Sequence, residues 1–495
     1  MKPLKELINE RPWTGWLLYL ITVIVVFALG MLASSVMERR AEAVFAYTPA
    51  VTFPENEPDS KVWGEVFPRE YYSYLRTSDT SFRSRYNGAA LIDMLDEYPS
   101  MVILWAGYSF SKDYKQGRGH FYSIEDIRNT LRTGAPVGDA PSPQPNTCWT
   151  CKSSNVPGLI AREGAAGFYR GTWEKRGAQV VNPIGCADCH DPKTMNLRIT
   201  RPALREAFES QGKDISQVSH QELRSLVCAQ CHVEYYFNKN IIPDVQYLVL
   251  PWKNGTSLEQ IEKYYDEAVF SDWTHAISKA PMLKAQHPDF EVYLTGTHAS
   301  RGVSCADCHM PFMSEGGLKF TDHHLQSPLN SISRSCQVCH REETARLIED
   351  VYQRQEKILE NRRVLENLLI KCHFEAKAAW DKGAQESQMI EILNYIRKAQ
   401  WRWDFAAAGH GNSFHSPVET GRIIASGISM AAEARLRLAR LLASFGVGGE
   451  VPVPDISTKA KAQAVAGLNM KNLNEEKSLF LKNIVPDWDK QAEKK

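Results

Sequence analysis

The sequence predicts a mainly α-helical protein with an irregular middle and long helices towards its C-terminus. Three observations favour this fold class. Five Cys-x-x-Cys pairs lie between residues 148 and 339, separated by loops rich in proline and glycine. The alternation of apolar and polar residues that is typical of strands is sparse. From about residue 341, apolar residues recur at helical spacing. Together these features indicate a chain that wraps cofactors instead of building a sheet.

The composition limits the class of partner. The 495 residues suffice for about three average domains, although a shared cofactor core could bind them into one. Lys and Arg together number 58, as do Asp and Glu, so the net charge favours neither nucleic acid nor a strongly acidic partner. Ten of the 11 cysteines fall in the five pairs, which is unlike a disulfide ladder, and Cys372 is a lone thiol in a predicted helix.

The N-terminal segment is predicted to be an export signal or a membrane anchor. Lys2, Lys5 and Arg11 precede an uncharged run at 12–37. This run is longer than the usual signal-peptide core of about 7–15 residues and reaches the ~20 residues that span a bilayer. On length we favour a retained anchor with its basic residues inside the cell. Cleavage at Ala41-Glu42-Ala43 is the alternative.

Three regions follow from these patterns: a signal or anchor at 1–44, a main domain at 45–445, and a linker with a peripheral tail at 446–495. The main domain begins with an extended arm to about residue 61. Short helices are expected at 89–94 and at 123–131, the second beginning at a capping serine, Ser123.

Three long amphipathic helices are predicted in the last third of the chain, at 341–374, 385–405 and 417–445. In the first of them Leu, Val and Ile recur at spacings of four or seven, with charged residues elsewhere. Helices of this length either pair with a second subunit, which would give a homodimer, or form an ordinary bundle within one chain. The pattern leaves both arrangements open.

Four of the five cysteine pairs are followed directly by histidine. A Cys-x-x-Cys-His unit attaches a c-type haem through two thioethers, and its histidine ligates the iron. Zinc or a redox dithiol could also use Cys-x-x-Cys, but neither requires a histidine after four pairs. The sequence therefore predicts covalent haem and a location outside the bacterial cytoplasm, where such haems are attached. The four units are Cys186-Cys189-His190, Cys228-Cys231-His232, Cys305-Cys308-His309 and Cys336-Cys339-His340.

The first pair, Cys148 and Cys151, is followed by Lys152 instead of histidine. A buried neutral amine can also donate to iron. A degenerate motif without haem is the alternative, but both cysteines remain and Trp149 offers an aromatic neighbour. An unusual proximal ligand favours an open distal side, where a substrate can coordinate. We therefore expect five haems, of which the one at Lys152 carries the reaction.

The histidine count agrees with this division. Of the 14 histidines, four directly follow cysteine pairs, and four more would be needed to close those haems. Six-coordinate bis-histidine haems cannot bind substrate and therefore relay electrons. The fold class is thus a mainly α multihaem cytochrome c, with haem-wrapping loops and long C-terminal helices.

The combination of motifs resembles the ammonia-forming pentahaem cytochrome c nitrite reductases. The likeness rests on the lysine unit as the first of five, on the run Cys228–Tyr235 and on the run Lys284–His287, and it covers about residues 65–445. It implies six-electron reduction of nitrite to ammonium in the periplasm. It also implies a membrane quinol-oxidising multihaem cytochrome as the electron donor.

The same resemblance implies an active site around Lys152. Arg132 would attract and hydrogen-bond the anion, and Tyr235 and His287 would donate or relay protons. Without the resemblance, Arg132 would more often be a surface charge or a partner of a haem propionate.

The resemblance further implies one Ca²⁺ beside the active haem. The side chains of Glu234 and Gln286 and the backbone carbonyls of Tyr235 and Lys284 would supply its oxygen ligands.

The resemblance finally implies one distal histidine for each relay haem. The assignments are His324 for the second haem, His120 for the third, His415 for the fourth and His298 for the fifth. His323 and His410 lie close to two of these positions and stay as alternatives. Three histidines are expected on the surface or in structural roles: His220, His275 and His373.

Two other functions remain open from the sequence. The same open haem could reduce hydroxylamine or sulfur oxyanions. A purely electron-transferring multihaem cytochrome would instead need every iron to be six-coordinate.

Overall fold

The structure, a computed structural model, describes residues 8–45, 53–86, 88–136 and 142–493, and for residues 38–45 it describes the backbone alone. Lys2, Lys5 and residues 46–52 of the expected arm lie outside these ranges. The described chain divides into two units. They comprise Met1–Thr52 with Ser314–Lys319, and Phe53–Met313 with Phe320–Lys495.

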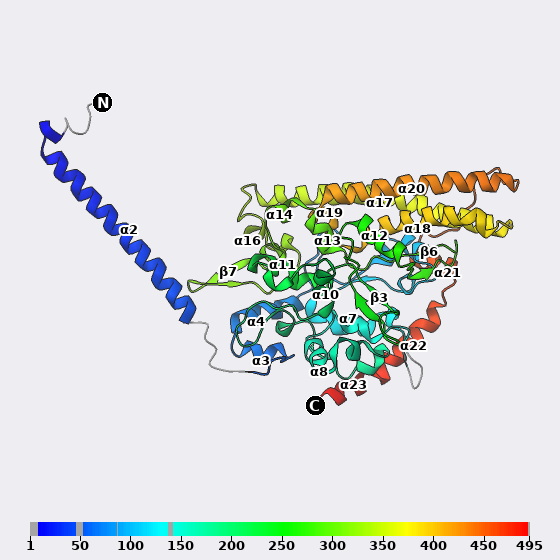
Figure 1. Ribbon diagram of the computed structural model, residues 1–495, viewed down its shortest axis with the longest axis horizontal. Coiled ribbons are helices and arrows are strands. Elements are labelled where there is room, and N and C mark those ends of the chain that lie inside the picture. Colours follow the sequence, from blue (N-terminus) through cyan, green and yellow to red (C-terminus); the bar gives the residue numbers. More distant parts are fainter. Residues whose placement is uncertain (1–7, 46–52, 87, 137–141, 494–495) are drawn as a thin grey trace. The chain divides into compact units, whose positions relative to one another are not determined.

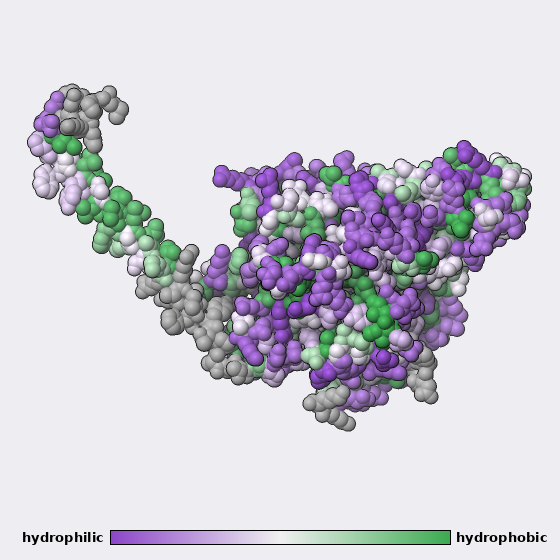
Figure 2. Space-filling view, viewed as in Figure 1, coloured by the Kyte–Doolittle hydropathy of each residue, from purple (hydrophilic) through white to green (hydrophobic). Residues whose placement is uncertain are grey.

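Helix α2 spans Trp13–Phe45. Its segment Trp13–Met37 has 25 residues and a mean hydropathy of 2.5, and none of its apolar window is buried. Figure 2 shows apolar side chains along this helix. The segment is therefore long and apolar enough to cross a membrane, although an N-terminal signal sequence has the same character. The possible cleavage motif Ala41–Ala43 lies within the α2 backbone, and its side chains are outside the description.

The middle of the chain consists of short helices joined by loops, as the sequence predicts (Figure 1). The α-helices here are α3 Ser60–Gly64, α4 Pro68–Leu75, α5 Met94–Glu97, α6 Ser100–Leu104, α7 Ser123–Asn129, α8 Val156–Tyr169, α9 Cys186–Cys189, α10 Pro202–Ser210, α11 His220–Ala229, α12 Leu258–Glu267, α13 Asp289–Leu294, α14 Thr297–Ser300, α15 Cys305–His309 and α16 Ile332–Ser335.

Strands form only two-stranded sheets within the described residues. The pairs are β1 Ile92–Asp93 with β2 Lys115–Gln116, β3 Tyr236–Asn238 with β4 Tyr247–Val249, β5 Trp273–Thr274 with β6 Pro281–Met282, and β7 Phe312–Glu315 with β8 Leu318–Thr321. The helix expected at 89–94 is wrong, because this stretch contains β1. The following helix starts only at Met94, where the Asp93 side chain accepts a hydrogen bond from the amide of Leu95 at 3.1 Å.

The expectation of a helix near 123–131 is confirmed by α7, but its capping serine acts differently. The hydroxyl of Ser123 donates to the carbonyl of Lys152 at 2.8 Å and accepts from the amide of Ile184 at 3.2 Å. Ser123 thus holds the first cysteine motif instead of capping its own helix.

The three long helices are confirmed as α17 Thr344–Asp381, α18 Glu386–Ala408 and α20 Pro417–Ser444, and they lie along one another (Figure 1). Their apolar stripes meet in one core, which includes Leu365, Leu369 and Ile424, all fully buried. Gly427 permits the close approach of these helices, because a Cβ on it would lie 2.7 Å from Cδ2 of Leu365.

The C-terminal segment is not the peripheral tail that we expected. After α20 come three more helices, α21 Lys459–Val465, α22 Met470–Asn483 and α23 Val485–Ala492. Phe480 is fully buried and Trp488 is nearly so, and both rings contact Trp173. The many lysines of this segment favoured an exposed position in the sequence-based prediction, but Phe480 and Trp488 fix the segment to the core. The remaining short helix, α19, spans Asn412–His415.

Candidate functional site

The five cysteine pairs all present free thiols. Each of these ten cysteines is at least partly accessible, whereas Cys372 is fully buried and lies 3.5 Å from the carbonyl of Ala431. Accessible thiols are what thioether attachment requires, whereas Cys372, predicted only as a lone helix thiol, is a buried packing residue.

Helix caps fix two of the motifs in place. Ser304 begins α15, where its hydroxyl accepts from the amide of Asp307 at 3.3 Å and its own amide donates to the Asp307 carboxylate at 2.8 Å. In the second motif, the amide of Gly185 likewise donates to the carboxylate of Asp188 at 2.8 Å. The variable residues inside the Cys-x-x-Cys units therefore set where the thiols and the following histidines point.

The motifs lie close together, and the third is their hub. Hydrogen bonds to Cys151 and to Cys305, together with burial, raise the pKa values of Cys231 and Cys228 well above the usual range. Burial and the neighbouring Asp188 and Cys231 raise the pKa of Cys189 as well. The first, second and fourth motifs thus all border the third.

The fourth and fifth motifs are also neighbours. Burial, and next the charge of Cys336, raises the pKa of Cys308 to about 12. The cysteine motifs consequently form one connected series, which suits a set of haems that pass electrons to one another.

Arg201 joins three motifs, a role that no sequence pattern indicated. Its guanidinium donates to the Asp188 carboxylate at 2.5 Å and to the carbonyls of Thr150 and Ser153 at 2.8 and 3.1 Å. Its amide donates to the side chain of Gln230 at 2.9 Å. Because Arg201 is fully buried, these charge-assisted bonds are shielded from water.

Four histidine pairs have the spacing of axial haem ligands. Two metal–nitrogen bonds of about 2.0 Å, plus about 1.1 Å from each nitrogen to its ring centre, separate two axial imidazoles by ~6.2 Å. Ring centres of four pairs match this distance. They are His190 with His323 at 6.1 Å, and His309 with His415, His298 with His340 and His232 with His287 at 6.2 Å each.

The imidazole hydrogen bonds also fit iron ligation. The Nδ1 atoms of His190, His309 and His323 face the carbonyls of Met195, Gln326 and Thr321 at 2.8, 2.9 and 2.8 Å. Such bonds fix the ring and leave Nε2 for a metal. The residues present therefore fit c-type haem at these motifs.

The second motif requires a correction, because His190 faces His323 and not the expected His324. Both ring nitrogens of His324 lie within 2.8 Å of the amide nitrogen of Gln326. Adjacent residues in an extended segment point to opposite sides, and the sequence could not tell which side faces the motif.

The third motif has two histidine neighbours. The ring centre of His232 lies 6.2 Å from that of His287. Burial, and then the charges of His232 and Lys152, lowers the pKa of His120 to about 4, so His120 also borders this motif. The Nδ1 atom of His232 lies 3.2 Å from the carboxylate of Asp289, a partner that we did not foresee. The Asp289 carboxylate thus occupies the Nδ1 side of His232.

The residues expected around Lys152 do come together. Burial, and then the charge of Lys152, lowers the pKa of His287 well below its usual value. Burial and the neighbouring Cys151 and Cys148 raise the pKa of Tyr235, while the charge of Arg132 opposes this rise. At neutral pH this places a neutral imidazole, a neutral phenol and a guanidinium beside the first motif.

The guanidinium of Arg132 is held by neighbours that the sequence did not reveal. Its central carbon lies 4.3 Å from the ring centre of Phe110, and the ammonium of Lys284 lies 4.8 Å from the same ring. Arg132 Nε also donates to the hydroxyl of Thr130 at 3.3 Å.

The residues expected to bind calcium lie together around the buried Glu234 carboxylate. The Glu234 carboxylate accepts from the hydroxyl of Tyr265 at 2.8 Å and from the amide of Gln286 at 2.6 Å. The side chain of Gln286 lies 3.3 Å from the carbonyl of Lys284. Burial raises the pKa of Glu234 well above its usual value and that of nearby Glu291 to about 8. The fully buried Glu234 carboxylate and the Lys284 carbonyl supply hard oxygen atoms, the type of ligand that calcium prefers.

The remaining histidines take different places. His275 and His373 are fully buried and stack with ring centres 3.7 Å apart, so they are structural, whereas His220 lies exposed at the start of α11. His410 stacks on Tyr114 with ring centres 6.4 Å apart.

Known proteins are similar to this chain along most of its length. The sequence profile described as cytochrome c552 matches residues 59–495. A cytochrome c-552 from Bacteroides fragilis is 54% identical over 483 residues, which are 97% of both chains. Another from Porphyromonas gingivalis is 52% identical over 488 residues, which are 98% of this chain and 97% of the relative.

A solved structure is similar as well. It is the catalytic subunit of the cytochrome c nitrite reductase from Desulfovibrio desulfuricans, described with two calcium sites. Its TM-score is 0.75 and its identity 29%, and the likeness covers 81% of this chain and 90% of that one.

Proposed function

The chain belongs to the cytochrome c552 family, and on this premise we propose that it is an ammonia-forming nitrite reductase. The observation that carries the proposal is the meeting of Arg132, Tyr235 and His287 at the only motif of the five whose cysteines are followed by lysine. Reduction of nitrite to ammonium consumes six electrons and releases two waters, so the site must bind an anion and deliver protons.

The haem held by Cys148, Cys151 and Lys152 would bind nitrite and supply the electrons. The Arg132 guanidinium supplies positive charge and several N–H donors for the nitrite oxygens. It keeps its position because Phe110 packs against its face and Thr130 accepts from its Nε. An anion is therefore attracted to one fixed place beside the first motif.

Tyr235 and His287 would pass protons to the oxygens that leave as water. Burial holds Tyr235 in its protonated form and His287 in its neutral form, so the phenol can donate and the imidazole can take up and pass on a proton. Each group is thus in the protonation state that a relay at neutral pH needs.

The calcium ion would be held by Glu234, Gln286 and the carbonyls of Tyr235 and Lys284. Two of these residues directly flank the relay, since Tyr235 follows Glu234 and His287 follows Gln286. A cation there would neutralise the buried Glu234 carboxylate and fix both proton-transfer groups.

The other four motifs would hold relay haems, giving five in all. We assign His323, His415 and His298 as the second ligands at His190, His309 and His340. For His232 we assign His120, which the family resemblance implies and whose nearness to His232 supports the assignment. This assignment leaves His287 for the active site. The number of relay haems is the same whether His323 or His324 is the second ligand at His190.

Electrons would come from a membrane quinol-oxidising multihaem cytochrome, with the enzyme facing the periplasm. An export signal or anchor in α2 supports this location. A homodimer through the long helices is supported by exposed apolar side chains there, such as Val364 at 49% and Leu436 at 46% exposure.

The decisive experiment uses the intact holoprotein. Its mass should report five haems, and with a reduced dye as the electron donor it should convert nitrite to ammonium. It should also show a high-spin haem that Lys152→His alters while the four relay haems keep their spectra. A fully loaded protein that makes no ammonium from nitrite, or that lacks any high-spin haem, would overturn the proposed function.

A further inference from the structure

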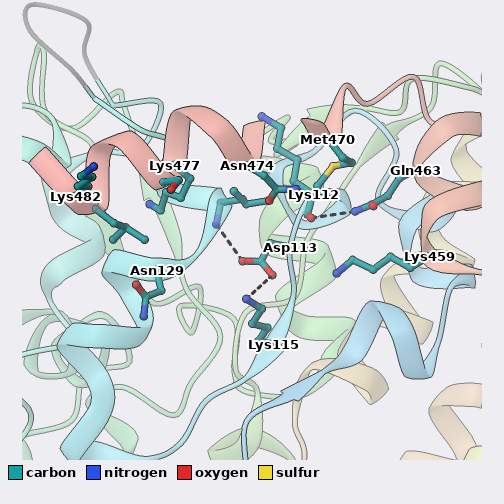
Figure 3. Close-up of a pocket in the computed structure, with 13 residues that line it drawn as sticks. Lys112, Asp113, Lys115, Asn129, Lys459, Gln463, Met470, Asn474, Lys477 and Lys482 are labelled. Carbon is teal, nitrogen blue, oxygen red and sulfur yellow. Dashed lines mark hydrogen bonds and ion pairs between the residues drawn. The ribbon is translucent and has the colours of Figure 1, made fainter. Parts of the chain in front are cut away.

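A lysine-lined cavity of about 640 Å³ lies between the C-terminal helices and the segment that leads to Arg132. Figure 3 shows helix α22, which carries Lys477, on one side of the cavity. Asp113 and Asn129, which both precede Arg132 in the chain, lie on the other side. Five lysines line the cavity, and Asp113 is the only carboxylate among its lining residues. Leu131, the residue before Arg132, also belongs to the wall, so the cavity borders the back of the active-site arginine.

Lys477 reaches from α22 to this segment. It is only 4% exposed, and its ammonium donates to the hydroxyl of Thr133 at 3.0 Å and to the carbonyl of Gly134 at 2.7 Å. Among the described residues, no carboxylate lies within salt-bridge distance of the Lys477 ammonium, and burial lowers the pKa of Lys477 to about 7. A buried lysine without a close carboxylate is costly, and such groups persist where their contacts serve a site.

Asp113 holds the other end of the same short turn. It is 2% exposed, and one carboxylate oxygen accepts from the hydroxyl of Thr130 at 2.9 Å and from the amide of Leu131 at 3.0 Å. The hydroxyl of Thr130 in turn accepts from Nε of Arg132 at 3.3 Å. The Thr130 hydroxyl thus links the Arg132 guanidinium to the fixed Asp113 carboxylate.

The turn itself is the 3₁₀ helix Leu131–Thr133, with Arg132 at its centre. It ends at Gly134, whose φ of +69° and whose closeness to Pro143 exclude a side chain. Three residues in one turn have few bonds of their own, so their position depends on the groups that hold the two ends.

We propose that Asp113 and Lys477 are positioning residues, which hold the two ends of the Leu131–Thr133 turn and so fix the Arg132 guanidinium where nitrite binds. The C-terminal segment thereby becomes part of the active site, although Lys477 lies more than three hundred residues from Arg132 in the sequence. The expected effect on nitrite binding rests on the proposed function, whereas the expected effect on the Leu131–Thr133 turn does not.

The test replaces Lys477 by methionine, which keeps the length and removes the donors. In the holoprotein, Lys477→Met should raise the KM for nitrite and the nitrite dissociation constant from optical titration about ten-fold, because a loosened guanidinium binds the anion less well. The kcat should change less than about two-fold. Amide hydrogen exchange within residues 128–136 should become about ten-fold faster, while exchange within α20 stays unchanged.

Lys482→Met is the matched control, since Lys482 lines the same cavity but does not bond to the turn. It should leave all four measurements unchanged. Equal effects of the two variants would indicate only the loss of a cavity charge and would overturn the proposal, as would unchanged exchange at 128–136 in Lys477→Met. If wild-type protein fails to use nitrite, the proposed function fails, and the exchange measurement still decides the positioning role.

Two further variants cover a failure of Lys477→Met to fold. Lys477→Arg retains donors and should stay closer to wild type than the methionine variant. Asp113→Asn weakens the other end of the turn and should reproduce the KM increase and the faster exchange. Wild-type values for a folded Asp113→Asn holoprotein would overturn the proposal.

Discussion

Two regions of this protein differ in what joins their elements. The helical scaffold (α17, α18 and α20) is joined by apolar side chains in a continuous buried stripe, among them Leu365 and Ile424. The motif region (residues 148–340) also has an apolar core, but buried polar bonds between side chains and backbone join its cysteine motifs, and Arg201 is the clearest example. Apolar packing tolerates small changes, whereas a buried polar network loses most when one partner is removed.

The contrast also explains where the chemistry lies. Repeated helical spacing lines one face of each scaffold helix with apolar side chains. The motif region places charged and titratable groups in irregular backbone, where each can be oriented separately. Variants in the two regions should therefore separate stability from activity.

The largest effect is expected from Arg201→Met in the motif region. The change leaves the buried Asp188 carboxylate without its cation and removes bonds to three motifs, so it should cost about 3–5 kcal/mol of unfolding free energy. Denaturant unfolding and haem content by mass spectrometry provide the measurements. Arg205→Met, an exposed neighbour on α10, should change little. Equal stability of the two variants would refute the contrast between the regions.

Arg132→Gln should separate activity from stability. Loss of the guanidinium should lower kcat/KM for nitrite about 100- to 1000-fold, the usual effect of removing a donor to a developing anion. Unfolding free energy and haem content should stay near wild type, because the guanidinium packs on Phe110 without a buried carboxylate partner among the described residues. Steady-state ammonium assays measure the effect, and a loss below ten-fold would contradict the assigned role.

Two buried and stacked imidazoles, His373 of the scaffold and His275 of the motif region, should make stability depend on pH. Burial lowers the pKa of His373 to about 4, and burial together with His373 lowers that of His275 well below its usual value. Since the unfolded imidazoles bind protons near pH 6.5, the unfolded state gains protons first as the pH falls. Stability should therefore fall between about pH 6.5 and 4, by on the order of 3 kcal/mol.

The variant His373→Gln tests this source of pH dependence. It removes one titrating group while an amide can still bond to Ser278 or Gln400. Unfolding measured at several pH values should show a shallower slope in the same window. An unchanged slope would assign the dependence to other groups.

The smallest effect is expected from Gly427→Ala in the scaffold. A Cβ there would meet Leu365 at 2.7 Å and Arg402 at 3.1 Å, so the helices must move apart at a cost of about 1–3 kcal/mol. Gly421→Ala on the same helix is the control, since its Cβ would lie 3.7 Å from Ile358 and should be neutral or slightly stabilising. Nitrite turnover should be unchanged in both, because neither touches the motif region.

Patterns that are local in the chain were predictable. Three patterns are each contained in a continuous stretch of sequence: the cysteine motifs with their histidines or Lys152, the apolar run of α2 and the apolar stripes of the long helices. The physical meaning of each can therefore be deduced from the sequence directly. The helix expected at 89–94 failed for the opposite reason. Its residues pair with Lys115–Gln116 from a later part of the chain, and no local pattern announces that partner.

By itself the sequence therefore determined the cofactor chemistry, the odd position of Lys152 and the mainly helical class. Only the tertiary structure decided that His323 and not His324 faces His190, that Arg201 joins three motifs, and that Lys477 supports the turn of Arg132. These contacts join distant segments, and whether a polar side chain points outwards or into a site depends on what the folded chain places opposite it.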